Sequence, residues 1–97
     1  MKTLNEIKHL LTEHKQELKR NYRVNKIGLF GSYVLGKQKK RSDLDILVEF
    51  DEPVSLLKLV GLENYLKEIT GINVDVIPKK DVRPELQKRI FNEVVFL

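Results

Sequence analysis

The chain has 97 residues, of which 41% are hydrophobic and 33% charged, and this balance is typical of one folded domain covering residues 1–97. No apolar run approaches the roughly 20 residues of a membrane span. The charged N-terminal stretch lacks the apolar core of a secretion signal, so we expect a cytoplasmic protein with no membrane partner. There is no cysteine, which excludes disulfides, thiolate metal sites and cysteine nucleophiles.

Lysine and arginine outnumber aspartate and glutamate by 18 to 14, which gives a net charge of +4. A basic balance suits anionic partners such as nucleotides or an acidic protein face. A lysine-rich soluble surface would give the same numbers. No basic stretch is interleaved with aromatic residues, so we do not expect a nucleic-acid partner.

Residues 2–20 show the spacing of an amphipathic helix. Thr3 and Glu6 have the three-residue spacing of a capping box at its start. His14 falls on the apolar stripe, where a packed or half-exposed histidine is favoured over a metal ligand, because an isolated histidine needs further ligands. The other members of the stripe are Leu4, Ile7, Leu11 and Leu18.

A buried strand is predicted from Lys26 to Phe30, and Gly28 within it indicates the close approach of another backbone or a ligand. Gly31-Ser32 ends this strand and opens a short helix that stops near Gly36. The turn presents backbone N–H groups and the Ser32 hydroxyl, which suit phosphate oxygens, although there is no Walker pattern.

The next predicted strand, Asp43 to Phe50, alternates acids with apolar residues. Because side chains in a strand repeat with period two, Asp43 and Asp45 share one face with Leu47 and Glu49. Two carboxylates on one face repel each other, and a divalent cation such as Mg²⁺ between them would explain their pairing. The opposite, core-facing side chains are Leu44, Ile46, Val48 and Phe50.

The second half of the chain continues to alternate helices and strands. Ser55 is a suitable N-cap for a helix from Leu56 to about Ile69, with inward side chains expected at Leu56, Leu59, Leu62, Leu66 and Ile69. A strand over residues 72–77 carries Asp75 between two valines, and a charge that protects an edge strand is the simplest reason for it.

A last helix is predicted from about Arg83 or Pro84 to about Glu93, with Leu86, Ile90 and Phe91 as its expected core face. Residues 94–97 read either as a short strand or as a packed tail. The element order predicts an α/β architecture with about four helices on a small sheet. Crossover helices favour parallel strands, and a mixed order stays open.

The pattern of Gly31-Ser32, ten intervening residues and then Asp43-Leu44-Asp45 resembles the polymerase-beta-like nucleotidyltransferases. The small size makes the chain similar to the minimal nucleotidyltransferases, including the antitoxins encoded beside HEPN-type toxins. Gly36 stands where that family has its second glycine, and Asp75 stands where it has a third carboxylate on the next strand. The resemblance therefore implies the fold of that superfamily, with a small mixed sheet.

What the resemblance implies is an enzyme that transfers a nucleoside monophosphate, with ATP as donor, to a hydroxyl. Asp43, Asp45 and Asp75 would be the catalytic and metal-binding residues, and the resemblance implies that they hold two Mg²⁺ ions. Gly31 and Ser32 would bind the phosphates, with Arg41 and Ser42 as further nucleotide-binding candidates. Such a transfer depends on positioning and charge neutralisation more than on a covalent residue.

Two neighbouring features stay open. The basic run from Lys37 to Arg41 could steer ATP, hold the leaving pyrophosphate or dock an acidic partner, or it could be an ordinary solvated loop. Tyr33 could stack on a base, but a role in packing the short helix is favoured.

The chain offers no separate region to bind an acceptor, so we expect a partner protein or a second copy to complete the site. The resemblance to antitoxins suggests a tyrosine hydroxyl of a cognate HEPN-type toxin, which would be modified with AMP and silenced. Two alternatives remain: a non-catalytic antitoxin that occludes its partner, and a nucleotidyltransferase acting on a small molecule or nucleic acid. The first is disfavoured because mutually repelling acids have no use in a purely binding protein.

Overall fold

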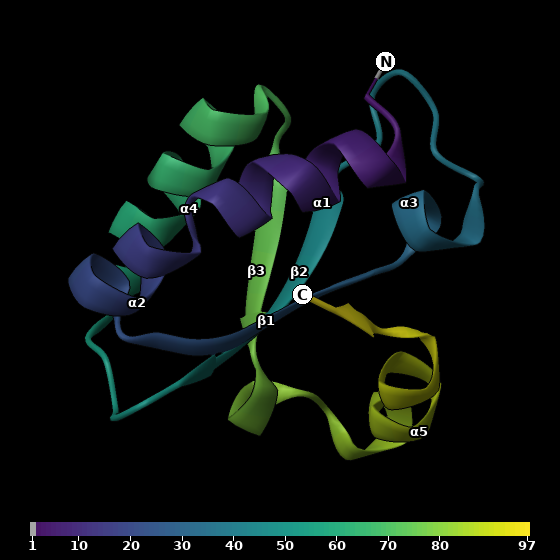
Figure 1. Ribbon diagram of the computed structural model, residues 1–97. Coiled ribbons are helices and arrows are strands. Elements are labelled where there is room, and N and C mark those ends of the chain that lie inside the picture. Colours follow the sequence, from purple (N-terminus) through teal and green to yellow (C-terminus); the bar gives the residue numbers. More distant parts are fainter. Residues whose placement is uncertain (1) are drawn as a thin grey trace.

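The computed structural model describes residues 2–97 and shows helices gathered on a small central sheet (Figure 1). The elements in chain order are α1 (Leu4–Glu13), α2 (Lys15–Tyr22), β1 (Val24–Phe30), α3 (Ser32–Leu35), β2 (Leu44–Phe50), α4 (Leu56–Thr70), β3 (Val74–Pro78), the 3₁₀ helix η1 (Lys79–Asp81), α5 (Pro84–Glu93) and β4 (Val95–Phe96). Within residues 2–97, no helix is both long and apolar enough to cross a membrane.

The four strands lie in the order β3-β2-β1-β4. β1 pairs antiparallel with both β2 and β4, whereas β2 and β3 are parallel and joined through α4. The predicted small mixed sheet is therefore confirmed, and parallel pairing is confined to the one pair of strands whose connection is a long helix.

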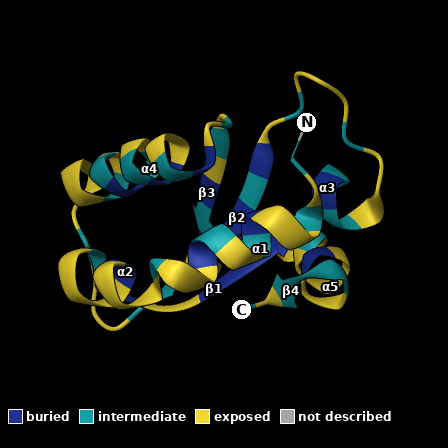
Figure 2. Cartoon of the chain, turned by 45° about the horizontal axis from the view of Figure 1, so that its top comes forward, coloured by how far each residue is buried: buried dark blue, intermediate teal, exposed yellow. Residues whose placement is uncertain are grey.

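The two faces of the sheet carry cores of different size. The larger core lies under α1, α2 and α4, and it takes Leu44, Ile46 and Val48 from β2. On the other face, Leu47 joins Phe30 and residues from the C-terminal part of the chain, Val82 and Ile90. Figure 2 shows buried strands beneath helices whose outer surfaces are exposed. The face that carries the predicted acids is thus partly covered by α5.

The predicted N-terminal helix is two helices that meet at His14. The capping box of Thr3 and Glu6 forms as predicted. The His14 Nδ1 atom lies 2.8 Å from the Leu10 carbonyl oxygen, and its ring meets the Tyr65 ring edge to face. His14 is half-buried, which confirms the prediction of a packing role.

Two side chains predicted to face the core are exposed. Leu56 is 76% exposed, because it is the first residue of α4, where the helix follows its Ser55 cap and has not yet reached the sheet. Phe91 is 39% exposed, because α5 turns Leu86 and Ile90, spaced by four residues, toward the sheet. Both predictions were wrong for the same reason: helical spacing defines a stripe, and only part of a stripe is covered.

The C-terminal residues form a strand and not a tail. β4 pairs with β1 at Gly28 and Leu29. A Cβ atom on Gly28 would lie 2.5 Å from a methyl of Val94 and 2.9 Å from the Phe96 ring. The close approach predicted at Gly28 is therefore confirmed, and the approaching segment is the end of the chain.

Candidate active site

The acids predicted from the sequence lie on neighbouring strands. Asp45 is the register partner of Phe30 on β1 and of Asp75 on β3. Asp43 comes just before β2 and is exposed, as is Asp75. Asp45 is on the same sheet face as Leu47 by strand alternation, so Asp45 and its register partner Asp75 lie on the face of the smaller core under α5.

Asp45 is in an electrostatically unfavourable position. Burial, and then the carboxylates of Asp75, Asp43 and Glu93, raise the pKa of Asp45 from 3.8 to about 6. The Arg89 guanidinium on α5 opposes this shift. A half-buried carboxylate surrounded by three others is a place where a cation would be strongly favoured.

The turn after β1 lies directly against this carboxylate. Gly31 has φ of +81°, and a Cβ atom there would overlap the Oδ2 atom of Asp45. The Gly31 carbonyl accepts the N–H groups of Val34 and Leu35, which starts the short helix α3. Only glycine satisfies both the backbone conformation and the contact.

The Gly31 N–H donates a hydrogen bond to Glu93, which was not among the site residues predicted from the sequence. The hydrogen bond with Oε1 of Glu93, the last residue of α5, is 2.6 Å long. The position of Glu93 could have indicated its role in the sequence. An acid in the last turn of a helix is disfavoured by the helix dipole, so its presence there requires some other stabilising contact. Arg89, one turn earlier, was also missed.

Ser32 opens α3, and the first amides of a helix have no partner inside it. The Ser32 amide and hydroxyl therefore lie at the turn that contacts Asp45. Tyr33 is only 3% exposed and packs into the larger core, which confirms the packing role favoured for it.

Arg41 and Ser42 lie apart from this group. The Ser42 hydroxyl accepts the Lys39 N–H at 2.8 Å and shapes the basic loop. Both residues line an open pocket of about 790 Å³ with Lys2, Lys40 and Tyr33, whereas Asp43 lines a separate pocket with Glu63 and Lys67. The structure thus places Gly31 and Ser32 against Asp45 and pairs Asp45 with Asp75, whereas Asp43, Arg41 and Ser42 line other pockets.

A divalent cation fits the chemistry of these acids. Across residues 2–97, no three acid or histidine side chains are gathered closely enough to be a ready-made metal site. The donors are hard carboxylate oxygens of the kind that Mg²⁺ prefers. Burial and then the repulsion from Asp75 and Asp43 raise the pKa of Asp45, and a bound cation would offset both effects.

A mixed sheet that sets a Gly-Ser turn against strand-borne carboxylates has the parts of an enzyme that transfers phosphoryl or nucleotidyl groups. Residues 11–97 match the family described as nucleotidyltransferase domain. The sequence is 48% identical over 98 residues to a Methanocaldococcus jannaschii protein described as a candidate protein adenylyltransferase, with all of both chains covered. It is 46% identical to the protein adenylyltransferase MntA of Thermococcus cleftensis, with 100% of this chain and 98% of that protein covered.

Solved structures share the fold. A structure described as a candidate minimal nucleotidyltransferase superposes with a TM-score of 0.76 at 27% identity, covering 94% of this chain and 95% of that one. A toxin–antitoxin complex with AMP-PNP gives 0.72 at 23% identity, covering 87% and 69%. A complex of tri-AMPylated Shewanella oneidensis HEPN toxin with MNT antitoxin gives 0.66 at 20%, covering 91% and 69%.

The chain belongs to the nucleotidyltransferase domain family, as its motif predicted. The fold expected from that resemblance is confirmed, and the protein is an enzyme of the nucleotidyltransferase class.

Proposed function

We propose that this protein transfers AMP from ATP, in a Mg²⁺-dependent reaction, to a tyrosine hydroxyl of a cognate HEPN-type toxin. The observation that carries the proposal is the register of Asp45 with Asp75 and with the residue before Gly31, which sets one carboxylate against the glycine turn and a second carboxylate beside the first. ATP is the donor of the AMP group, so we place the reaction in the cytoplasm.

Asp43, Asp45 and Asp75 would hold Mg²⁺, which when bound neutralises phosphate charge. The Ser32 amide and hydroxyl bind phosphate oxygens, and the close contact between Gly31 and Asp45 keeps the turn near the acids. The acceptor oxygen forms a bond to the α-phosphorus, and the bond from that phosphorus to pyrophosphate breaks. Asp75, exposed on an edge strand, takes the proton of the acceptor hydroxyl.

Several observations support a protein acceptor. The relatives in Methanocaldococcus and Thermococcus carry protein adenylyltransferase names and match this chain along its whole length. The fold is shared with an antitoxin in complex with an AMPylated HEPN toxin. An accessible Asp75 is compatible with a hydroxyl that is delivered by another protein. Arg41 and Ser42 stand as nucleotide-binding candidates because they line an open pocket with Lys2 and Lys40 and directly precede Asp43 in the chain.

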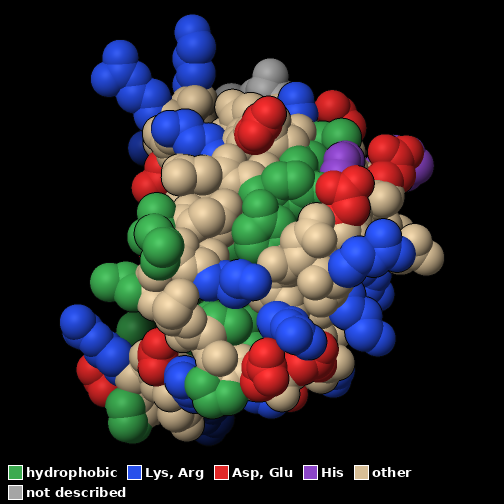
Figure 3. Space-filling model, turned by 90° about the vertical axis from the view of Figure 1, so that its left-hand side faces the viewer, with side chains coloured by type: hydrophobic (Ala, Val, Ile, Leu, Met, Phe, Trp, Pro, Cys, Tyr) green, Lys and Arg blue, Asp and Glu red, His purple; other side chains and the backbone are tan. Residues whose placement is uncertain are grey.

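A non-catalytic antitoxin that occludes its partner is the alternative, and it would need an exposed surface for docking. Leu56, Leu57 and Val60 are exposed at the start of α4. Figure 3 shows hydrophobic side chains at the surface of the side that carries α2 and α4. Such side chains are suited to protein docking, which either function requires.

The test is to incubate the protein with its partner toxin, ATP and Mg²⁺ and to measure the intact mass of the toxin. The expected result is an adduct of AMP on a tyrosine, absent without Mg²⁺ and absent with Asp45→Asn. A folded complex that inhibits the toxin without ATP, and equally well with Asp45→Asn, supports occlusion instead. AMP transfer to a small molecule or RNA in the absence of any protein acceptor would redirect the substrate class.

A further inference from the structure

The last residue of α5 reaches across the fold to the turn at Gly31. Glu93 Oε1 accepts the Gly31 N–H at 2.6 Å, in a partly buried hydrogen bond between residues 62 positions apart. A hydrogen bond to a charged acceptor is roughly twice as strong as one between neutral groups. The bond therefore fixes the Gly31 amide and with it the direction of the turn.

The backbone on both sides of Glu93 is anchored. Three residues earlier, Ile90 is buried in the smaller core. After it, Val94 and Phe96 pack on Gly28, and the Leu97 N–H bonds to the Ile27 carbonyl. Glu93 is thus held by packing, and its carboxylate is not free to move away with the end of the chain.

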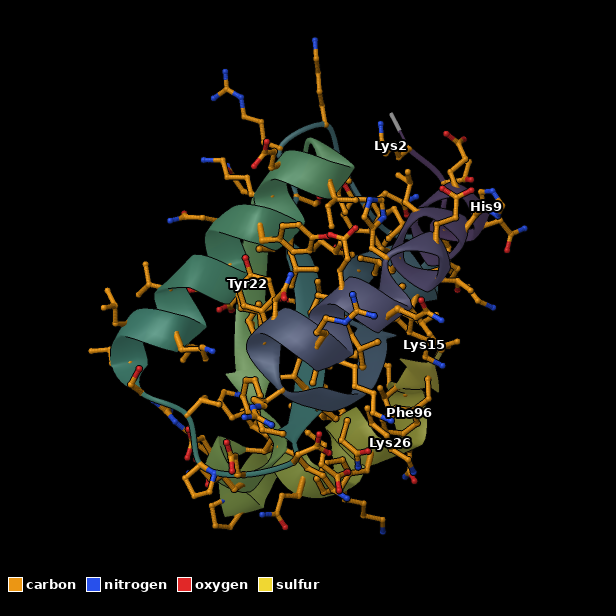
Figure 4. All side chains as sticks on the ribbon, turned by 60° about the vertical axis from the view of Figure 1, so that its left-hand side comes forward. Lys2, His9, Lys15, Tyr22, Lys26 and Phe96 are labelled. Carbon is orange, nitrogen blue, oxygen red and sulfur yellow. The ribbon has the colours of Figure 1, made fainter. Side chains whose placement is uncertain are left out.

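Lysines from two other elements add to this anchoring. The Lys26 ammonium lies 5.4 Å from the centre of the Phe96 ring, and the Lys15 ammonium donates to the Leu97 carbonyl at 2.9 Å. Figure 4 shows Lys15, Lys26 and Phe96 gathered at this end of the chain. The segment after Glu93 is therefore tied to β1 and to α2.

The location of Glu93 is otherwise unfavourable. An acid at the C-terminal end of a helix faces the negative end of the helix dipole. It also adds negative charge beside Asp45, which already faces Asp43 and Asp75. The hydrogen bond to Gly31 is the contact that accounts for an acid at this position.

We propose that Glu93 is a positioning residue of the nucleotide site: by accepting the Gly31 N–H, it holds the glycine turn against Asp45 and leaves the Ser32 amide and hydroxyl to bind phosphate. This inference rests on the proposed function, because it assigns the turn to phosphate binding. The inference also means that Gly31 acts through its backbone conformation and not as a phosphate donor, because its N–H already donates a hydrogen bond to Glu93.

The experiment compares Glu93→Gln with Glu93→Ala. Glutamine keeps a carbonyl oxygen that can accept the Gly31 N–H, whereas alanine removes the acceptor. Glu85→Ala is the matched control, because Glu85 is an exposed acid in the first turn of the same helix. Binding of MgATP is measured by calorimetry, and exchange of the Gly31 amide hydrogen is measured by NMR.

We expect Glu93→Ala to weaken MgATP binding by about tenfold, the size of one charge-assisted hydrogen bond, with Glu93→Gln within about threefold of the wild type. Exchange at Gly31 should be faster in Glu93→Ala than in Glu93→Gln, and Glu85→Ala should change neither quantity. If Glu93→Ala does not fold, Glu93→Asp replaces it, since the shorter side chain loses its reach to Gly31.

Unchanged MgATP binding by a folded Glu93→Ala or Glu93→Asp overturns the inference, because the turn would then bind phosphate without Glu93. Tighter binding also overturns it, because the Glu93 carboxylate would then repel the phosphates. A wild-type protein that binds no MgATP counts against the proposed function instead. In that case the exchange rates at Gly31 still decide whether Glu93 fixes the turn.

Discussion

Asp45 and Asp75 face each other across the parallel pair β2-β3 as register partners. Adjacent parallel strands lie about 4.8 Å apart, so two carboxylates in register on one face are close neighbours. Such a pair is costly unless a cation or a proton is shared between the acids. The strand register therefore places Asp45 and Asp75, which are far apart in the sequence, in one site.

Replacing any of the three acids by its amide should remove activity and leave the fold intact. Asp43→Asn, Asp45→Asn and Asp75→Asn each keep the side-chain shape but remove a charged ligand. We expect AMP transfer to fall by at least about a hundredfold for each variant, as for other losses of transition-state charge stabilisation. Asp81→Asn, an exposed acid of η1, is the control and should retain activity. An active Asp75→Asn would remove Asp75 from the catalytic set.

The pH dependence of stability should report the position of Asp45. Its pKa is raised from 3.8 to about 6, so in the folded state Asp45 keeps its proton at pH values where the unfolded chain has lost it. The contribution of Asp45 to folding is therefore present at low pH and is lost as the pH rises from about 4 to about 6.

Without added metal, Asp45→Asn should consequently be more stable than the wild type above pH 7, and the gap should close toward pH 4. Urea unfolding followed by circular dichroism across this range measures the gap. Asp81→Asn provides the comparison at an exposed acid. A gap that does not change with pH would show that charge repulsion at Asp45 is not its origin.

Metal binding should stabilise the native protein through the same acids. A ligand that binds only the folded state raises stability by mass action, by about 2.7 kcal/mol at a hundredfold excess over its dissociation constant. Mg²⁺ should therefore raise the melting temperature of the wild type and have little effect on Asp45→Asn. Equal shifts in the two proteins would place the cation elsewhere, and chelation with EDTA should reverse the wild-type shift.

The parts of the site that the sequence predicts well depend on short spacings. Strand alternation was sufficient to place Asp45 on the face of Leu47, whereas Asp43 precedes β2, and the Gly31-Ser32 turn follows from a strand that ends in glycine. Strand pairing is a long-range property, so the register of Asp45 with Asp75 was not accessible from either segment alone. The same holds for the hydrogen bond from Gly31 to Glu93, which joins positions 62 residues apart.

The buried faces of the helices were predicted less well than the strands. The difference between a residue predicted to be buried and one that is buried can be measured. Leu56 and Leu62 carry the same side chain in α4, yet Leu56 is 76% exposed and Leu62 is fully buried. Leu62→Ala should cost about 2–5 kcal/mol of unfolding free energy, and Leu56→Ala should stay within about 0.5 kcal/mol of the wild type. Chemical denaturation measures both, and similar losses would mean that the start of α4 is covered.

The contact between Gly31 and Asp45 gives the most specific test of the turn. Gly36, with φ +69° and ψ 23°, is in the left-handed helical region, where an alanine meets strain of about 1–2 kcal/mol. Gly31, with φ +81° and ψ −154°, is in a region essentially restricted to glycine, where the strain is about 1–3 kcal/mol. Only at Gly31 would the added methyl also overlap a neighbour, Asp45 Oδ2, whereas the space around Gly36 is open. Gly31→Ala should therefore cost more unfolding free energy than Gly36→Ala. The extra cost should shrink when Asp45→Ala is combined with Gly31→Ala, which a double-mutant cycle measures. If the two single variants are equally stable and the cycle shows no coupling, the glycine turn does not lie against Asp45.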